Sequence, residues 1–233
     1  MARVSTTYRS DSFSARLHDY GLLIKFKLSL TVVFSAVMSY LILGVRSLLG
    51  ALGLFIGGML VTGAAHALNQ VLENEFVVLM ERTKNRPVVM GRISPSEAVL
   101  AAGLMSLIGI TILGMFNPLT AFLAMLSLVL YSFLYTPLKR FSPVAVLIGT
   151  IPGALPILIG GAAIQGYLSA FAITLFAIQV LWQLPHFWAI GWLGFEDDQK
   201  AGFKLRPVKN QRLDSTVGLY SFFAAIPLVL LGI

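Results

Sequence analysis

The stretch Leu52–Phe76, "LGLFIGGMLVTGAAHALNQVLENEF", determines the architecture that we predict for the chain. Its first 17 residues carry no charge, and it ends in two acidic residues, Glu73 and Glu75. An apolar run of about 20 residues is long enough to cross a bilayer core as a helix. Similar runs recur along the whole chain, which is 57% hydrophobic and only 12% charged. The sequence therefore predicts an all-α, polytopic transmembrane helix bundle.

Seven apolar segments are visible in the sequence. They are too long for the strands of a membrane barrel, which need only about ten residues, so we expect helices. The expected segments are Leu22–Gly44, Leu48–Leu68, Ala98–Phe116, Leu119–Tyr135, Val144–Ile164, Leu168–Trp192 and Thr216–Ile233.

The charges alternate between the loops that connect these segments. Of the 17 Lys and Arg residues, only Arg46 lies in an odd-numbered loop, and all ten acidic residues lie on the opposite side. Because cytoplasmic loops are rich in Lys and Arg, we expect a cytoplasmic N-terminal tail (residues 1–20) and cytoplasmic even-numbered loops. This topology accounts for the net charge of +7, and binding to nucleic acid is not predicted.

The second loop carries a first group of candidate site residues. Asn69 and Glu73 are four residues apart and would share one helix face, whereas Glu75 would point away from both. Their hard oxygen atoms suit Mg²⁺, which takes one or two carboxylates together with substrate phosphates. Arg82 and Arg86 are also four apart, and their forked donors match phosphate oxygens.

The sixth loop repeats this pattern. Glu196, Asp197 and Asp198 are followed by basic residues that include Lys204. Two acidic clusters on one side of the membrane could hold metal ions around one diphosphate. From composition and spacing alone, solvated loops in which acid–base pairs support helices are an equally good interpretation.

Three blocks of sequence carry a resemblance to a known family: "NQVLENEFVVLMERTKNRPVVMGRIS", "LYTPLKRFSPVAVLIGTIPGALPILIGGAA" and "LWQLPHFWAIGWLGFEDDQKAGFKLRPV". Together they resemble the protoheme IX farnesyltransferases (heme O synthases) of the UbiA-type superfamily of intramembrane prenyltransferases. The resemblance extends from Leu22 to about Tyr220. The strings "RTKNRP", "YTPLKR" and "LPHFWAI" favour the heme branch over the quinone and chlorophyll branches.

The resemblance implies a fold and an activity. Members are bundles of about nine transmembrane helices around a central cavity. They use Mg²⁺ to transfer the farnesyl group of farnesyl diphosphate to the vinyl group of heme b, giving heme O for terminal oxidases. It further implies a prenyltransferase domain at residues 21–233 that lacks the last two helices, a bacterial inner membrane with the active site on its cytoplasmic side, and heme A synthase or a terminal oxidase assembly as partners.

The resemblance also assigns the acidic residues. The first motif of the superfamily has the form Asn-x-x-x-Asp/Glu-x-x-x-Asp, and Asn69 and Glu73 match its first two positions. Its third position falls on Val77, which cannot bind a metal, so Glu75 is a candidate substitute. The second motif falls on Asp197 and Asp198.

The basic residues and one histidine complete the expected site. The resemblance implies that Arg82, Arg86, Lys139 and Lys204 neutralise the diphosphate. Lys139 and Arg140 could instead reach the acceptor or only set the topology, and His186 could bind the acceptor or be structural. Two rival functions remain open: a UbiA-type transferase with another aromatic acceptor, and a degenerate homologue that binds heme or lipid without catalysis.

Overall fold

The computed structural model describes residues 12–44, 47–204, 208–209, 212–213 and 216–231, so Arg46 lies outside the described residues. Within that part of the chain, six helical spans are long and apolar enough to cross a membrane, which confirms the polytopic bundle. The seventh predicted segment forms α11 (Thr216–Leu231), which at 16 residues is shorter than the others. The six spans are α2 (Phe26–Leu43), α3 (Leu48–Leu72), α5 (Pro95–Gly114), the continuous run Pro118–Leu138, α8 (Ala145–Gln165) and α9 (Ala170–Leu193).

Local sequence signals set where these helices begin. The side chains of Ser47, Ser94, Asn117 and Ser169 each accept a hydrogen bond from a backbone N–H of the first helical turn. Such caps satisfy donors that have no partner inside a helix. In α5 and α6 (Pro118–Val129), a proline directly follows the cap, where its missing N–H costs nothing.

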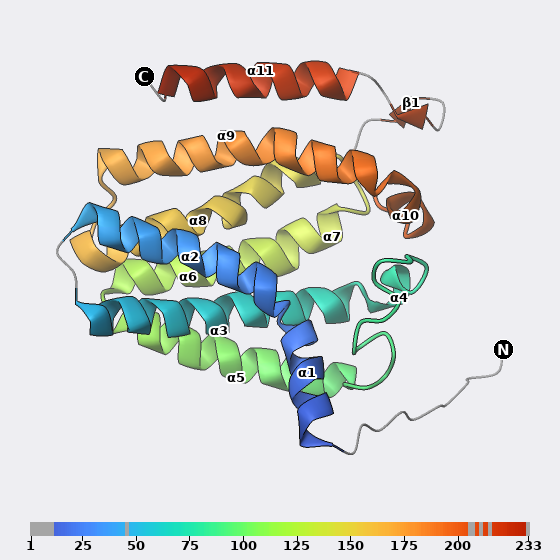
Figure 1. Cartoon of the computed structure of the whole chain (residues 1–233), viewed down its shortest axis with the longest axis horizontal. Helices are drawn as coiled ribbons and strands as arrows, with labels where there is room; N and C mark the ends of the chain where they lie inside the picture. Colours follow the sequence, from blue (N-terminus) through green and yellow to red (C-terminus); the bar gives the residue numbers. More distant parts are fainter. Residues whose placement is uncertain (1–11, 45–46, 205–207, 210–211, 214–215, 232–233) are drawn as a thin grey trace.

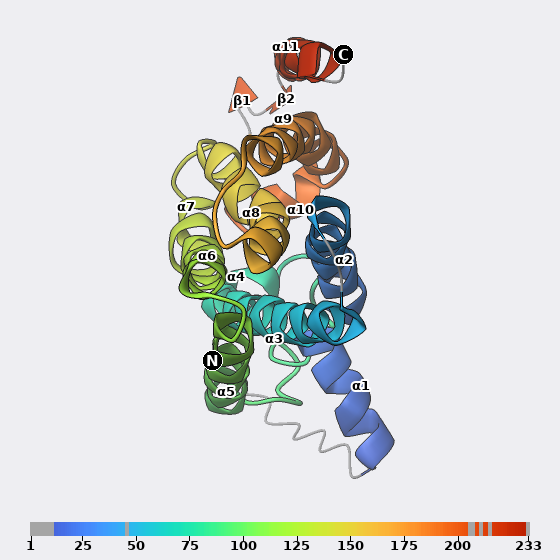
Figure 2. The same cartoon turned by 90° about the vertical axis from the view of Figure 1, so that its left-hand side faces the viewer.

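The spans enclose a space that remains open on one side. Helix α3 packs against α2 and α5, and α8 packs against α2, α6 and α9. Figures 1 and 2 show α9 on the far side of α8 from α3, with α11 packed outside α9. Helices α2 and α9 both pack against α8, and both line the cavity between the spans.

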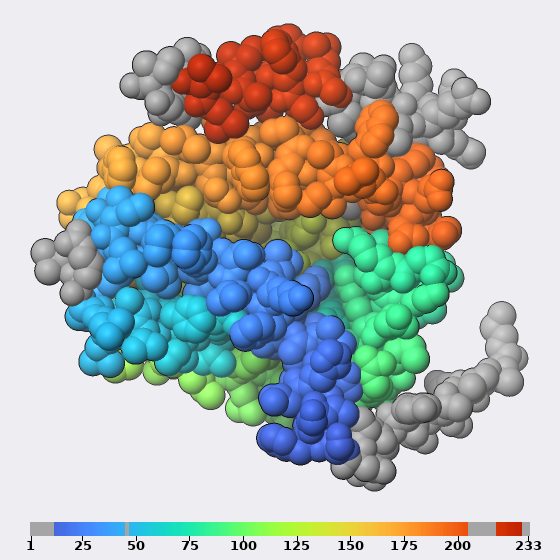
Figure 3. Space-filling model, viewed as in Figure 1, coloured from blue at the N-terminus to red at the C-terminus, as the bar shows by residue number. Residues whose placement is uncertain are grey.

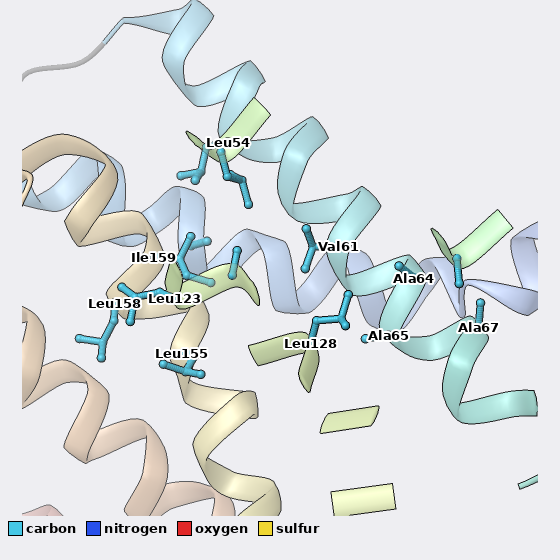
Figure 4. Close-up of a cluster of buried hydrophobic side chains, with 14 of the residues drawn as sticks. Leu54, Val61, Ala64, Ala65, Ala67, Leu123, Leu128, Leu155, Leu158 and Ile159 are labelled. Atoms are coloured by element: carbon cyan, nitrogen blue, oxygen red, sulfur yellow. The ribbon is translucent and has the colours of Figure 1, made fainter. Parts of the chain in front are cut away.

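Small side chains allow the helices around this space to approach closely. The buried cluster in Figure 4 joins α3, α6 and α8 through Leu54, Val61, Leu128, Leu155 and Ile159, and it continues along α3 through alanines. Helices α2 and α8 meet at Gly160, where a Cβ atom would lie 2.0 Å from the backbone oxygen of Ala36.

The short elements gather at one end of the bundle (Figure 1). They are α4 (Asn74–Val77), α7 (Thr136–Leu138), α10 (Phe195–Lys200) and a two-stranded antiparallel pair, β1 (Val208–Lys209) with β2 (Arg212–Leu213). They belong to the second, fourth and sixth loops, which the sequence predicts to be cytoplasmic.

A further helix, α1 (Phe13–Leu23), crosses the predicted boundary at residue 20. It is tied to the end of the second loop and the start of α5. Asp19 pairs with Arg92 at 2.8 Å, and Tyr20 donates to Glu97 over 2.7 Å. Residues 1–11 of the predicted tail lie outside the described residues.

Candidate active site

A cavity of about 1240 Å³ occupies the space between the helices. Its lining comes mainly from α2, α3, the run Pro118–Leu138, α8, α9 and the second, fourth and sixth loops, with single leucines from α5 and α11. In Figure 3 the surface is hollowed between α2 (blue) and α9 (orange), with the second loop (green) beside one end of the hollow. The cavity has a charged end at these loops and an apolar chamber deeper in the bundle.

Asn69 and Glu73 lie together at the charged end. Helix α3 ends at Leu72, but the N–H of Glu73 still donates to the carbonyl of Asn69 over 3.1 Å, so both side chains leave the same helix face. Both are buried and line the cavity. The predicted shared face is therefore present in the structure.

Three cations contact these two residues. Lys139, from the fourth loop, forms an ion pair with Oε1 of Glu73, and Arg86 lies 3.4 Å from Oε2. Lys25, between α1 and α2, donates to Oδ1 of Asn69 over 3.1 Å, while the Asn69 amide donates to Thr136 over 3.1 Å. Every carboxylate or carbonyl oxygen of Asn69 and Glu73 side chains thus faces a positive charge.

These contacts alter the acid–base properties of the cluster. Burial alone would raise the pKa of Glu73, but Lys139, Lys25 and Arg86 together hold it below its usual value. Burial and the nearby Arg86 lower the pKa of Lys25, against the opposing effect of Glu73. Glu73 is therefore ionised at neutral pH.

The two aspartates of α10 have different surroundings. Asp198 is buried and lines the cavity. Asp197 lies outside the lining, and its carboxylate accepts the backbone N–H groups of Arg82 and Glu81 over 3.3 and 3.4 Å. These hydrogen bonds, the one from Arg82 first, lower the pKa of Asp197. Asp197 thus joins the sixth loop to the second.

The structure brings together seven of the predicted site residues along one cavity and leaves four outside it. The cavity is lined by Asn69, Glu73, Arg82, Arg86, Lys139, His186 and Asp198. Glu75 and Lys204 are exposed outside the lining, and Arg140 stacks over the ring of Phe76 at 3.7 Å. Asp197, described above, is the fourth.

Val77, the third position of the first motif, connects the two acidic loops. It is buried at 1% exposure and packs with Met80 and with Ala201, which follows α10. It also lines the cavity. An apolar contact therefore stands where the motif would place a third carboxylate.

The donor set fits a metal ion that shares its ligands with a substrate. Among the described residues, no group of three or more His, Cys, Asp and Glu side chains could enclose a metal ion. Glu73, Asp198 and Asn69 nevertheless offer hard oxygen atoms to the same cavity. Mg²⁺ is usually held by one or two carboxylates together with substrate phosphates rather than by a protein cage. The residues present fit such a shared ion.

A π-helical turn, η1 (Leu130–Tyr135), forms part of the wall next to the charged end. Such turns are rare and frequently occur at functional sites. Tyr131 and Tyr135 project from it into the lining, with ring centroids 5.5 Å apart. The ammonium of Lys139 lies 4.9 Å from the centre of the Tyr135 ring, where the ring face favours a cation.

The deeper chamber is mostly apolar, with a few polar groups. Gly149, Pro152, Gly153 and Pro156 of α8 line it, so this Gly- and Pro-rich segment is a cavity wall over that part of its length. Where α9 faces the opening, the ring of His186 stacks on that of Trp182, with centroids 4.8 Å apart and an angle of 16° between the planes.

His66 is a second cavity-lining histidine, one turn before Asn69. It is buried, and neither ring nitrogen has a hydrogen-bond partner in the described structure. Its ring meets that of Tyr131 edge-on at 5.4 Å.

Sequence reasoning missed Lys25 as a site residue. A lysine at the start of a membrane helix is expected to extend toward the interface. Instead, Lys25 has a left-handed backbone (φ 48°), and its side chain enters the cavity. Two lysines inside the predicted span Leu22–Gly44, Lys25 and Lys27, were the available signal, because charges are rare within an apolar span.

Comparison with known proteins identifies the family to which this chain is similar. The sequence profile of the UbiA prenyltransferase family matches residues 29–233. A protoheme IX farnesyltransferase from Cytophaga hutchinsonii is 44% identical over 207 residues, which cover 87% of this chain and 72% of that protein.

Solved structures support the same fold. A solved structure from work on digeranylgeranylglyceryl phosphate synthase in membranes aligns with a TM-score of 0.77 at 20% identity, covering 93% of this chain and 76% of that one. A UbiA homologue from Archaeoglobus fulgidus, bound to GPP and Mg²⁺, aligns with a TM-score of 0.68 at 15% identity, covering 91% and 73%. At these identities the likeness concerns the fold. The chain belongs to the UbiA prenyltransferase family and, within it, to the protoheme IX farnesyltransferases.

Proposed function

We propose that this prenyltransferase moves a farnesyl group from farnesyl diphosphate to a vinyl group of heme b, giving heme O, and that it requires Mg²⁺. The observation that carries the proposal is a single cavity whose charged end holds the Lys139–Glu73–Arg86 cluster and whose chamber is apolar. A prenyl diphosphate has the same division, since a diphosphate head is joined to an apolar tail.

The charge of the cavity supports a diphosphate ligand. Among the described residues, four cationic side chains and two carboxylates line it, which gives that lining an excess of positive charge. The cations are Lys25, Arg82, Arg86 and Lys139, and the carboxylates are Glu73 and Asp198. Cations fixed around a departing diphosphate stabilise the charge that develops on it.

In the proposed reaction, Asn69, Glu73 and Asp198 hold the metal together with the diphosphate. When bound, Mg²⁺ would neutralise negative charge on the leaving group. Arg82, Arg86 and Lys139 bind the remaining oxygens, and the bond between the diphosphate and the farnesyl carbon breaks to leave an allylic cation. The vinyl group attacks this allylic cation through its terminal carbon, which leaves a second cation on the carbon next to the porphyrin ring. A water molecule adds to that second cation and loses a proton, which gives the hydroxyl group of the product. Before this C–C bond forms, the apolar chamber keeps water away from the allylic cation, which would otherwise be hydrolysed.

The stacked Trp182 and His186 rings favour a planar acceptor beside the opening between α2 and α9. This arrangement, together with the named relative, supports heme over a smaller aromatic acceptor. By the charge asymmetry of the loops, we further propose that the charged end faces the cytoplasm across a bacterial inner membrane.

The test is a transfer assay with the purified protein in lipid nanodiscs. Farnesyl diphosphate, Mg²⁺ and either heme b or a hydroxybenzoate are supplied, and products are identified by mass spectrometry. We expect a farnesylated heme that disappears when EDTA is added. Farnesylation of the hydroxybenzoate without farnesylation of heme would overturn the assignment of heme b as the acceptor. Heme binding by absorbance with no product from either acceptor would favour the non-catalytic homologue.

A further inference from the structure

Two of the residues proposed to bind the metal, Asn69 and Glu73, have side-chain oxygens that are already in contact with basic side chains of the protein. In Glu73, Oε1 pairs with Lys139 and Oε2 faces Arg86 at 3.4 Å. In Asn69, Oδ1 accepts from Lys25 over 3.1 Å. A metal ion at these two residues needs the same oxygens and would be repelled by the same charges.

A bound diphosphate would remove this competition for the oxygens of Asn69 and Glu73. Its own oxygens can accept the hydrogen bonds that the three basic side chains now donate to the protein. The three basic side chains line the same cavity as Asn69 and Glu73, so a diphosphate bound in this cavity could contact them. Hydrogen bonds between ammonium and phosphate groups are among the stronger ones in proteins. Each cation that turns to the diphosphate frees an oxygen for the metal.

Lys25 differs from the other two cations in a way that makes it testable. Lys139 and Arg86 pair with the buried carboxylate of Glu73, and removal of either would leave that charge less compensated. Lys25 contacts the neutral amide of Asn69. That amide keeps its hydrogen bond to Thr136 without Lys25, so the substitution leaves no buried charge without a partner.

We propose that Lys25 is an exchangeable hydrogen-bond donor, which covers Oδ1 of Asn69 before ligands bind and turns to the diphosphate when metal and diphosphate bind. The proposal rests on the proposed function, since it takes the ligand to be a metal-bound diphosphate. It assigns to Lys25 an effect of opposite sign on the two ligands: it weakens metal binding in the absence of diphosphate and strengthens diphosphate binding.

The test compares Lys25→Met with the unaltered protein in nanodiscs. Binding of Mn²⁺ without diphosphate is measured by electron paramagnetic resonance, and binding of inorganic diphosphate in EDTA by calorimetry. We expect the Mn²⁺ affinity to rise about threefold or more. We expect the diphosphate affinity to fall about tenfold, the effect of losing one charge-assisted hydrogen bond.

Two variants control for site and charge. Lys27→Met removes an exposed lysine two residues along the chain and outside the cavity, and it should change neither affinity more than about twofold, as expected for a screened surface charge. The gain in Mn²⁺ affinity expected for Lys25→Met should disappear in the double variant Lys25→Met/Glu73→Gln. If Lys25→Met does not fold, Lys25→Gln, which also lacks the charge, carries the same expectation.

The proposal is overturned if both affinities fall, as for a structural lysine, or if only the diphosphate affinity falls, as for an ordinary anion ligand. Neither measurement requires turnover. Failure of the proposed function would appear instead as the absence of farnesyl transfer by the unaltered protein.

Discussion

The carboxylate of Asp197 holds the backbone of Arg82: its Oδ2 accepts the Arg82 N–H over 3.3 Å, and its Oδ1 accepts the N–H of Glu81 over 3.4 Å. The sixth loop thereby fixes the segment of the second loop from which Arg82 reaches the cavity. The next residue, Asp198, lines the cavity itself. Two adjacent aspartates thus have separable tasks.

The first prediction concerns these two residues. Asp198→Asn removes a carboxylate from the cavity wall, and we expect kcat/KM for farnesyl transfer to fall about 100-fold or more. Asp197→Asn keeps one oxygen that can accept a backbone N–H, and we expect a loss of less than about tenfold, the lower end of the range for residues that orient a site. Equal losses in steady-state assays of the two variants would contradict this division.

A second prediction concerns the ion pair of Glu73 with Lys139. Lys139→Met leaves the buried carboxylate with Arg86 as its remaining close partner, so we expect a loss of about 1–3 kcal/mol in the free energy of unfolding. Adding Glu73→Gln removes the buried charge and should restore part of that stability. Thermal unfolding in nanodiscs measures both, and a double variant less stable than Lys139→Met would count against it.

A third prediction concerns Val77, which is buried between the two acidic loops. Val77→Asp loses the contacts with Met80 and Ala201, so we expect a lower melting temperature. Because Val77 also lines the cavity, the new carboxylate should raise the Mg²⁺ affinity measured with diphosphate present, by about tenfold.

The neighbouring Val78, which is 49% exposed, is the matched control for this substitution. Val78→Asp should leave both the melting temperature and the Mg²⁺ affinity nearly unchanged. If Val77→Asp folds but binds Mg²⁺ no more tightly than the unaltered protein, the absent third acid of the motif does not limit the site.

A fourth prediction concerns the contact of α2 with α8. A Cβ at Gly160 would lie 2.0 Å from the backbone oxygen of Ala36, so Gly160→Ala must push the helices apart, at a cost of about 1–3 kcal/mol in the free energy of unfolding. Gly103, inside α5, has nothing within 4 Å of such an atom, and Gly103→Ala should be neutral or stabilising by up to about 1 kcal/mol. Similar melting temperatures for the two variants would refute the close approach.

The helices could be predicted from the sequence because an uncharged run of this length has few alternatives to a membrane helix. The shared helix face of Asn69 and Glu73 could also be predicted from the sequence, since helical spacing persists through the end of α3. Both are local properties, and neither depends on how distant segments meet.

The remainder of the site depends on contacts between distant segments. Lys139 enters the cavity whereas Arg140, the next residue, stacks on Phe76. Sequence cannot separate such neighbours, because the turn that follows α7 decides which of them faces inward. Lys25 escaped notice for the same reason, since its inward direction comes from a left-handed backbone that its residue type does not favour.

A backbone hydrogen bond joins the sixth loop to the fourth, since the N–H of Lys204 donates to the carbonyl of Lys139 over 2.6 Å. The side chain of Asp197 joins the sixth loop to the second by accepting the N–H of Arg82. If each loop moved separately, the hydrogen bonds that join it to its neighbours would have to break. The second, fourth and sixth loops should therefore open as one cooperative unit, with amide protons that exchange at a common rate, so that a ligand which orders one of them slows exchange in all three.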